Sequence, residues 1–325
     1  MKTKIMPKNN KTYSSRKTVK STKLKPANIK PATRRMGAYK CSVLASVSRE
    51  PEAVECFGSF TPAFEDKRHN VQLFRANCVE FLNSMAKAAP QGCVDMIFAD
   101  PPYFLSNGGI SCQNGRMVSV NKGDWDKSRG PDLNHEFNRQ WLSACQKVLK
   151  PNGTIWVSGT AHVIHSIGFA MQQLGFKTLN DITWVKPNPP PNLSCRYFTH
   201  ATETVIWGGK NINSRHLFHY NEMRLINNNK QMKSVWEFLP PGYSEKEFGK
   251  HPTQKPLGLL NRILLASSNP GDTILDPFMG SGTTGVAAVK LKRRFIGVEL
   301  EHRYIDTAKK RIGQATGEVD NNKIV

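Results

Sequence analysis

Short apolar runs alternate with segments of helical period along the chain, from about Lys67 to Ile312. Four to eight mostly apolar residues bounded by turn residues are typical of a buried strand, and apolar residues three and four positions apart are typical of a packed helix. We expect strands at Val71–Ala76 (an edge strand), Val94–Ala99, Thr154–Ser158, Ile182–Lys186 and Thr204–Trp207, from Thr273, and at Phe295–Glu299. Strands and helices alternating in this way predict one doubly wound α/β domain, with helices on both faces of a mostly parallel sheet.

Helical periodicity fills the gaps between these strands. Its apolar faces are marked at 78–85, 137–149, 161–174, 260–264, 283–291 and 301–312. Two stretches break the alternation. Residues Phe104–Gly130 are rich in glycine and polar residues, which predicts a mobile loop without secondary structure. Residues 208–250 gain Asn, Lys, Arg and His, which indicates an insertion in the domain of residues 67–312.

Both ends of the chain are expected to lie outside the domain. Residues 1–66 lack sustained periodicity and predict a disordered basic arm, and residues 313–325 predict a frayed, flexible tail. Met1–Lys40 contains 13 Lys or Arg and no Asp or Glu, which leaves a net +8 of the total +21 for the remainder. Such a charge favours a polyanionic partner such as DNA, although the arm is equally well interpreted as a solvated tail.

The cysteines and the apolar runs of the sequence bear on metal binding and on the cellular compartment. Seven cysteines show no paired C-x-x-C spacing, so we expect no zinc or other metal site. Cys78 and Cys145 fall on helical faces as small apolar residues, and His162 and His165 have no third ligand in sight. No apolar run is long enough for a bilayer and no signal peptide opens the chain. We therefore expect no membrane partner and a reducing cytoplasm, with the protein at the nucleoid if DNA is its partner.

The strongest chemical signal is Asp100-Pro-Pro-Tyr103, directly after the strand Val94–Ala99. Two prolines remove backbone donors and hold the chain extended, so this segment neither continues a strand nor starts a helix. It offers a carboxylate, the carbonyl of Pro101 and an aromatic ring at the carboxyl end of a strand, where open α/β sheets bind ligands. This set suits an exocyclic amine of a nucleobase, and a proline-stiffened loop with a capping Asp is the simpler alternative.

A glycine-rich turn follows a second strand at Asp276-Pro-Phe-Met-Gly-Ser-Gly-Thr-Thr284. Gly280 and Gly282 allow close backbone approach, and the N-terminus of the helix that follows favours a carboxylate or a phosphate. The turn lacks the spacing of a dinucleotide fingerprint and the Lys of a phosphate-binding loop. One strand later, Glu299 ends an apolar run and is suited to binding two ribose hydroxyls.

The two motifs, the acid and their order resemble the β class of amino-group DNA methyltransferases, which use S-adenosylmethionine. Within that class, Asp100–Lys127 and Asn192–His200 resemble the DpnA-type enzymes that methylate adenine N6 in GATC. The resemblance covers roughly residues 67–312. It implies a Rossmann-like methyltransferase fold with an antiparallel edge and a target-recognition role for residues 208–250. The resemblance also implies duplex DNA as partner, with single strands as a further substrate. A homodimer and a restriction partner are left open.

Roles follow from the resemblance by position. The catalytic residues would be Asp100, Pro101, Pro102 and Tyr103. The cofactor would be bound by Asn77 (alternatively a helix N-cap), Thr253, Lys255, Asp276, Phe278, Gly280, Ser281, Gly282, Thr283, Thr284 and Glu299, with Thr253 and Lys255 at its methionine end. Arg196, Tyr197 and His200 would contact DNA.

These roles predict methylation of adenine N6, and two alternatives to that reaction are kept. Hydrogen bonds to Asp100 and Pro101 would hold the amine of a flipped adenine, and Tyr103 would stack on the base. Cytosine N4 methylation is the alternative, because the same acceptors would hold that amine. A DNA-binding protein without catalysis is the alternative from another class.

Overall fold

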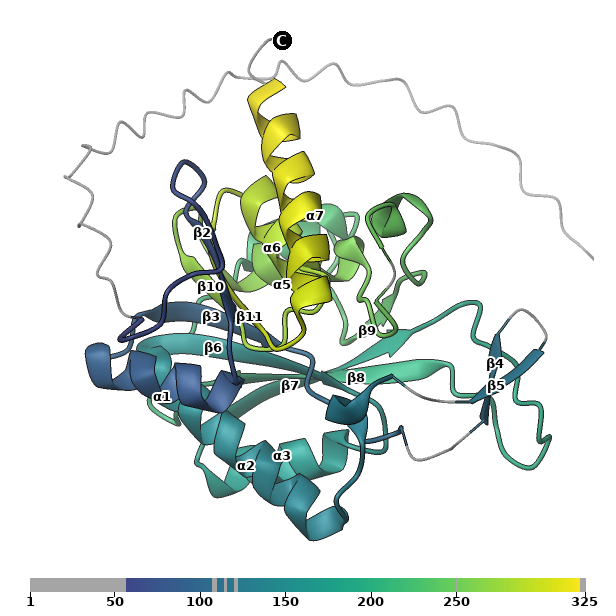
Figure 1. The fold of residues 1–325 in the computed structure, drawn as a ribbon. Helices are drawn as coiled ribbons and strands as arrows, with labels where there is room; N and C mark the ends of the chain where they lie inside the picture. Colours follow the sequence, from purple (N-terminus) through teal and green to yellow (C-terminus); the bar gives the residue numbers. More distant parts are fainter. Residues whose placement is uncertain (1–56, 107–109, 114–115, 120–121, 250, 322–325) are drawn as a thin grey trace, which may run out of the picture. The chain divides into compact units, whose positions relative to one another are not determined.

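The computed structural model describes residues 57–106, 110–113, 116–119, 122–249 and 251–321. Nine strands form one sheet in the order β1-β2-β11-β10-β3-β6-β8-β7-β9 (Figure 1). Their bounds are β1 Phe64–Asp66, β2 Val71–Arg75, β3 Val94–Ala99, β6 Leu149–Gly159, β7 Lys177–Val185, β8 Thr202–Gly209, β9 Val235–Glu237, β10 Thr273–Asp276 and β11 Arg294–Glu299. Five of the eight strand pairs are parallel, and the antiparallel pairs all involve β1 or β8. The predicted mostly parallel α/β sheet is confirmed.

Helices cover both faces of this sheet (Figure 1). One face carries α1 (Cys78–Ala88), α2 (Pro131–Val148) and α3 (Ile164–Gln173), and the other carries α5 (Leu257–Ser267), α6 (Thr283–Lys290) and α7 (His302–Asn321). Strand β3 shows why a strand in the middle of this sheet is apolar on both of its faces. Ile97 and Ala99 belong to the core with α1–α3, whereas Met96 and Phe98 belong to the core with α5–α7. A strand between two helical layers is apolar at every position, not at alternate ones.

The folded part extends beyond both predicted boundaries. Phe57 packs 4.9 Å from Phe74 between ring centroids, and β1 pairs with β2, so β1 and not β2 is the edge strand. At the other end, α7 runs past Ile312 because Ala315 is buried on its inner face. The expected start at residue 67 and the expected frayed tail from 313 are therefore corrected. Residues 1–56 lie outside the described part, so the expectation for the basic arm stays a prediction.

The segment Phe104–Gly130 contains secondary structure, contrary to expectation. Ile110–Gln113 (β4) pairs antiparallel with Arg116–Ser119 (β5), and Asp124–Asp126 forms a short 3-10 helix, η1. Cross-strand pairing satisfies the backbone of β4 and β5 although their sequence has little apolar periodicity.

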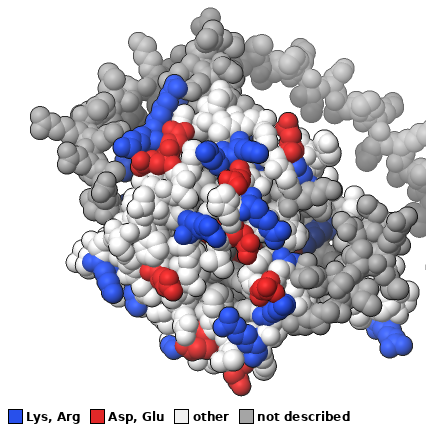
Figure 2. Space-filling view, in the orientation of Figure 1, with Lys and Arg blue, Asp and Glu red and all other residues white. Residues whose placement is uncertain are grey.

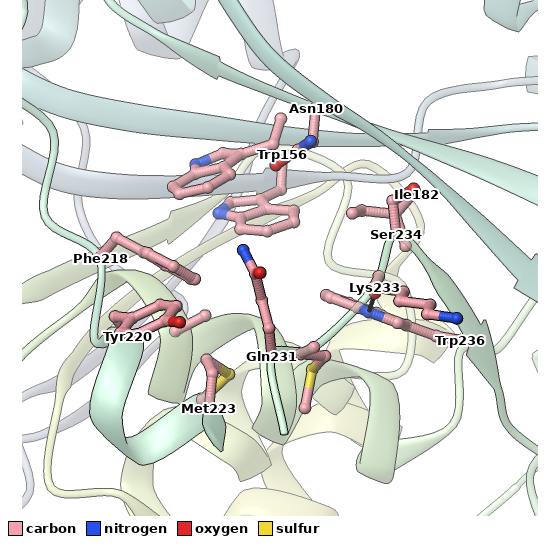
Figure 3. A pocket seen from close by; sticks show the side chains of 13 residues that line it. Trp156, Asn180, Ile182, Phe218, Tyr220, Met223, Gln231, Lys233, Ser234 and Trp236 are labelled. Carbon is pink, nitrogen blue, oxygen red and sulfur yellow. Dashed lines mark hydrogen bonds between the residues drawn. The ribbon is translucent and has the colours of Figure 1, made fainter. Parts of the chain in front are cut away.

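The insertion at residues 208–250 folds back onto the sheet. It contributes α4 (Tyr220–Ile226) and β9, which pairs parallel with β7. Between them and the sheet lies a cavity of about 190 Å³ (Figure 3). Five of its thirteen described lining residues are aromatic, and none is Asp, Glu, His or Cys: Trp156, Asn180, Ile182, Trp207, Phe218, Tyr220, Met223, Gln231, Met232, Lys233, Ser234, Trp236 and Ala266. Lys233 and Tyr220 are the ionisable residues in this described lining.

We predict that Gly285→Ala destabilises the fold. A Cβ at Gly285 in α6 would lie 2.5 Å from Ile312 Cδ1 and 2.7 Å from Phe295 Cε1, so α7 and β11 would have to shift. Overpacking of this kind costs about 1–3 kcal/mol of unfolding free energy, measured by denaturant titration. The control is Gly313→Ala in α7, where a Cβ meets nothing within 4 Å. That change should stabilise the protein by about 0.5–1 kcal/mol. Equal effects of the two changes would contradict this packing.

Candidate active site

Four parallel strands end along one edge of the sheet and carry polar residues there. Asn77 follows β2, Asp100 follows β3, Asp276 ends β10 and Glu299 ends β11. Asn77, Asp100 and Glu299 line a cavity of about 210 Å³ at this edge. The other lining residues are Ala76, Cys78, Pro102, Trp125, Arg129, Phe137, His251, Thr253, Pro277, Phe278, Val298, Leu300 and Tyr304. The two sequence motifs thus meet at one cavity, as the ends of parallel strands in open sheets do.

Asp100 is paired inside the protein with a lysine from a distant segment. Lys255 Nζ lies 2.6 Å from Asp100 Oδ2, and the Tyr103 hydroxyl donates to Asp100 Oδ1 at 2.7 Å. Only 12% of the Asp100 side chain and 5% of the Lys255 side chain are exposed. Burial raises the pKa of the Asp100 carboxyl above its usual range, and the Lys255 ammonium opposes that rise. Lys255, predicted from the resemblance to bind the cofactor, is thus a partner of Asp100 and does not line the cavity.

A second buried acid, Glu203 on β8, belongs to the same cluster. Its carboxylate accepts from the Tyr103 hydroxyl at 3.1 Å, lies 3.6 Å from Lys255 Nζ and pairs with Lys186 at the end of β7. Burial works to raise the pKa of Glu203, but Lys255 and Lys186 outweigh it and lower the pKa to about 2. The sequence interpretation missed Glu203, although a lone acid in the apolar run Thr202–Trp207 is a usable signal.

Tyr103 occupies the centre of this cluster, not an open stacking position. Its ring is 5% exposed, its hydroxyl also lies 3.2 Å from Ser158 Oγ, and the ammonium groups of Lys122 and Lys255 each lie 5.2 Å from the ring centroid. Burial, together with Asp100 and Glu203, raises the pKa of Tyr103 well above its usual value, so the hydroxyl stays a donor. The ring is thus buried in this structure, and its stacking on a base stays a prediction.

The backbone after Asp100-Pro-Pro is held by Asp126, which the sequence interpretation also missed. This fully buried carboxylate of η1 accepts from the backbone N–H of Tyr103 at 2.8 Å, Phe104 at 2.9 Å and Leu105 at 3.2 Å. It also accepts from the Ser106 hydroxyl at 2.8 Å. Successive N–H groups around one carboxylate form an anion-binding concavity, here filled by the protein itself. Asp126 thereby positions the loop that carries Asp100.

The glycine-rich turn is held by two acids, Asp276 at its start and Glu299 at the end of β11. Asp276 is 2% exposed and accepts from Thr284 Oγ1 at 2.6 Å and from Phe278 N at 3.0 Å. Burial raises the pKa of Asp276 to about 7. Glu299 accepts from Gly280 N at 3.0 Å, which leaves its carboxylate at the cavity wall.

The remaining residues of this turn pack against α7. Arg311 Nη1 donates to Ser281 O at 2.7 Å and to Thr283 Oγ1 at 3.0 Å. Gly282 has a φ of 77°, and a Cβ there would lie 2.7 Å from Ala308 Cβ. Of the predicted cofactor residues, Asp276, Gly280, Ser281, Gly282, Thr283 and Thr284 do not line the cavity. Their contact with the cofactor stays a prediction.

Three further lining residues are Asn77, His251 and Trp125. Asn77 caps α1 by accepting from Val79 N at 2.9 Å, so the N-cap alternative is confirmed, and it also lines the cavity. His251 Nδ1 accepts from Thr253 N at 3.3 Å, and burial, aided by Lys255, lowers the pKa of His251 to about 3. Trp125 Nε1 is buried with no hydrogen-bond partner among the described residues. An orphan donor at a cavity wall is a group that a bound ligand satisfies.

The residues predicted to contact DNA lie together on an exposed loop between β7 and β8. Arg196, Tyr197 and His200 are all exposed, with the Tyr197 and His200 rings 5.5 Å apart. Asn192 Nδ2 donates to Tyr197 O at 2.6 Å and shapes the loop. Elsewhere, the face in Figure 2 shows Lys and Arg interspersed with Asp and Glu where it is not grey, so it carries no continuous basic surface.

Two searches of the described residues bear on partners. No group of three or more His, Cys, Asp or Glu side chains there could hold a metal ion. Among the helices of the same residues, none is long and apolar enough to cross a membrane.

A buried carboxylate at the end of a central parallel strand, beside a cavity shared with a glycine-rich turn, defines the class of S-adenosylmethionine-dependent methyltransferases. A family model described as DNA methylase, for N6 and N4 methyltransferases, matches residues 94–310. The chain belongs to this family of DNA methyltransferases, and S-adenosylmethionine is its cofactor.

The similar proteins are type II methyltransferases. The chain is 54% identical over 246 residues to M2.DpnII of Streptococcus pneumoniae, covering 75% of this chain and 90% of that one. It is 55% identical over 249 residues to M2.LlaDCHI of Lactococcus lactis subsp. cremoris, with 76% and 91% covered. The crystal structure of the M1.HpyAVI–SAM complex matches with a TM-score of 0.57 at 30% identity, covering 74% of this chain and 98% of that one.

We predict that Asp126→Asn lowers both stability and methyl transfer. The amide group keeps one acceptor oxygen but turns a donor toward the N–H groups of Tyr103 to Leu105, so about 1–3 kcal/mol of unfolding free energy should be lost. The control is Asp124→Asn in the same short helix, because that exposed side chain pairs with Lys127 alone among the described residues. The control should unfold and methylate as the unchanged enzyme does. Full activity of Asp126→Asn would contradict the positioning role of Asp126.

Proposed function

We propose that this enzyme methylates N6 of adenine, in the sequence GATC, on a base flipped out of the DNA. The observation that carries the proposal is the Asp100 carboxylate at the wall of the cavity, next to the stiff Pro101 carbonyl. The resemblance of Asn192–His200 and Phe104–Lys127 to the DpnA-type enzymes supports adenine and GATC. The similarity to M2.DpnII supports adenine as the target base.

The chain's own residues would activate the amine. The N6 lone pair of adenine is delocalised into the ring, which makes the amine a poor nucleophile. Hydrogen bonds from its two N–H groups to Asp100 and to the Pro101 carbonyl would favour a pyramidal nitrogen with a free lone pair. A carboxylate oxygen can accept two hydrogen bonds, so the bonds from Tyr103 and Lys255 leave room on Asp100. No described residue donates to the Pro101 carbonyl.

The cavity residues would hold the cofactor beside this amine. Bound S-adenosylmethionine supplies an electrophilic methyl group on a sulfonium centre. Asn77, Thr253, Phe278 and Glu299 line the cavity and are the predicted residues in reach of it. The orphan Trp125 Nε1 at the same wall supports a polar ligand there. Alignment of the two reactants by the two strand ends would supply much of the acceleration.

A target base must leave the duplex to reach this site. Only 12% of the Asp100 side chain is exposed, so a base within the stack cannot contact it. The loop with Arg196, Tyr197 and His200 follows directly after Lys186, which pairs with Glu203 of the catalytic cluster. That connection supports a DNA contact close to the flipped base. We propose double-stranded DNA as substrate, with single strands accepted because a base there needs no unpairing.

A nuclease-protection assay tests the proposal. Plasmid DNA incubated with the enzyme and S-adenosylmethionine should resist a nuclease that N6-methyladenine in GATC blocks. Full cleavage, with methyl groups incorporated elsewhere, would refute GATC as the site. Incorporation into cytosine would favour the N4 alternative, and no incorporation would favour the non-catalytic DNA-binding protein.

We predict that Asp100→Ala abolishes methyl transfer while cofactor affinity stays within a few-fold of the unchanged enzyme. The reason is that Asp100 is assigned to the amine and Glu299 and Asn77 to the cofactor. Transfer of tritium from labelled cofactor measures the first effect, and calorimetry measures the second. A variant that no longer binds S-adenosylmethionine would overturn the assignment.

We predict that Arg196→Ala relaxes sequence choice. A guanidinium suits bidentate contact with a guanine edge, which contributes about 1–3 kcal/mol of discrimination. Methylation rates on oligonucleotides with each GATC base replaced in turn should show relaxation at the guanine position. An even loss across all sequences would show that Arg196 contacts a phosphate instead.

A further inference from the structure

Four charged side chains form one continuous row of contacts from Asp100 to the start of the exposed loop between β7 and β8. In order they are Asp100, Lys255, Glu203 and Lys186, and each contacts the next. They come from four segments that the fold brings together: the end of β3, the segment before α5, the start of β8 and the residue after β7. Two carboxylates and two ammonium groups alternate, so the four side chains together carry no net charge.

Burying four charged groups costs free energy unless every one of them is paired. Removing an ion from water costs several kcal/mol, and its counter-ion returns that cost only in good geometry. The first three members are 12%, 5% and 9% exposed at their side chains. An uncharged side chain in place of Lys255 would leave Asp100 and Glu203 as two anions in one desolvated space, where one of them takes up a proton.

We propose that Lys255 and Glu203 are positioning residues that control the ionisation of Asp100 with opposite signs. The inference rests on the proposed function, in which Asp100 must be ionised to accept the target amine. Lys255 is the cation in direct contact with Asp100, and Glu203 is the anion that shares both Lys255 and the Tyr103 hydroxyl with Asp100. Their positions therefore predict that replacing one shifts the ionisation of Asp100 upward in pH and replacing the other shifts it downward.

The other charged or titratable groups facing Asp100 do not cancel this effect. Tyr103 donates a hydrogen bond to Asp100 and stays protonated. Among the described residues, Asp100 also acts electrostatically on Lys122, before η1, and on Asp276, at the end of β10. Burial lowers the pKa of Lys122 and raises the pKa of Asp276, so each loses charge as pH approaches its shifted value. Neither side chain forms a hydrogen bond or ion pair with the Asp100 carboxylate in the described part of the chain, whereas Lys255 does so at 2.6 Å.

The sign of each effect follows from electrostatics. Methyl transfer falls as pH drops through the pKa of Asp100, since a protonated carboxyl no longer accepts both the amine and its existing donors. Removing the Lys255 cation raises that pKa and moves the acidic limb of the pH–rate profile to higher pH. Removing the Glu203 anion lowers that pKa and moves the limb to lower pH.

The experiment compares kcat against pH for the full-length enzyme and four variants, using labelled S-adenosylmethionine and GATC duplex. Lys255→Met should move the acidic limb up by about one pH unit or more, a tenfold loss of the ionised form on the acidic side. Glu203→Gln should move it down. Lys255→Arg keeps the charge and should leave the limb near that of the unchanged enzyme. The double variant Lys255→Met/Glu203→Gln should lie between the two single variants, because the effects oppose.

Each other outcome overturns the inference. A limb that stays in place in both single variants, or that moves the same way in both, shows a merely structural role. A higher KM for the cofactor in Lys255→Met, with an unmoved limb, shows that Lys255 binds S-adenosylmethionine. If Lys255→Met does not fold, Glu203→Gln alone decides by the direction of its shift. An unchanged enzyme that methylates no adenine refutes the proposed function instead, so the two failures are distinguishable.

Discussion

The desolvated contact between Asp100 and Lys255 is the constraint on which the rest of the site depends. A carboxylate meant to accept hydrogen bonds from a neutral amine must be both ionised and shielded from water, and these requirements conflict. Lys255 resolves the conflict by bringing a positive charge to 2.6 Å from Asp100, and Glu203, which pairs with Lys186, gives Lys255 a second carboxylate at 3.6 Å. The cluster costs desolvation, and the Tyr103 hydroxyl offsets part of that cost because its single proton lies within reach of both acids, at 2.7 Å from Asp100 and 3.1 Å from Glu203 between oxygens.

The scaffold around this pair is rigid for identifiable reasons. Asp126 holds the backbone of three consecutive residues after Pro102, and Arg311 joins the glycine-rich turn to α7. Neither side chain touches the cavity. A precise arrangement of reacting groups depends on such supports, because a small displacement removes much of the benefit of alignment.

Local sequence predicted most of the sheet and the location of the site. The apolar runs at Val94–Ala99 and from Thr273 are strands, and the polar residues that follow them meet at one edge. The contacts of Lys255 and Glu203 were not predictable, because 155 residues separate Asp100 from Lys255 and 100 separate Tyr103 from Glu203. Periodicity identifies which face of an element is buried but not which polar side chains meet across the fold. The edge strand β1 and the hairpin of β4 and β5 were missed because both are short and weakly apolar.

The most direct test of the account is to identify the methylated nucleoside. DNA incubated with the enzyme and methyl-labelled S-adenosylmethionine would be digested to nucleosides and separated with mass detection. The account predicts that the label appears as N6-methyl-2′-deoxyadenosine and disappears with Asp100→Ala. Label found only in N4-methyl-2′-deoxycytidine, or retained in Asp100→Ala, would contradict it.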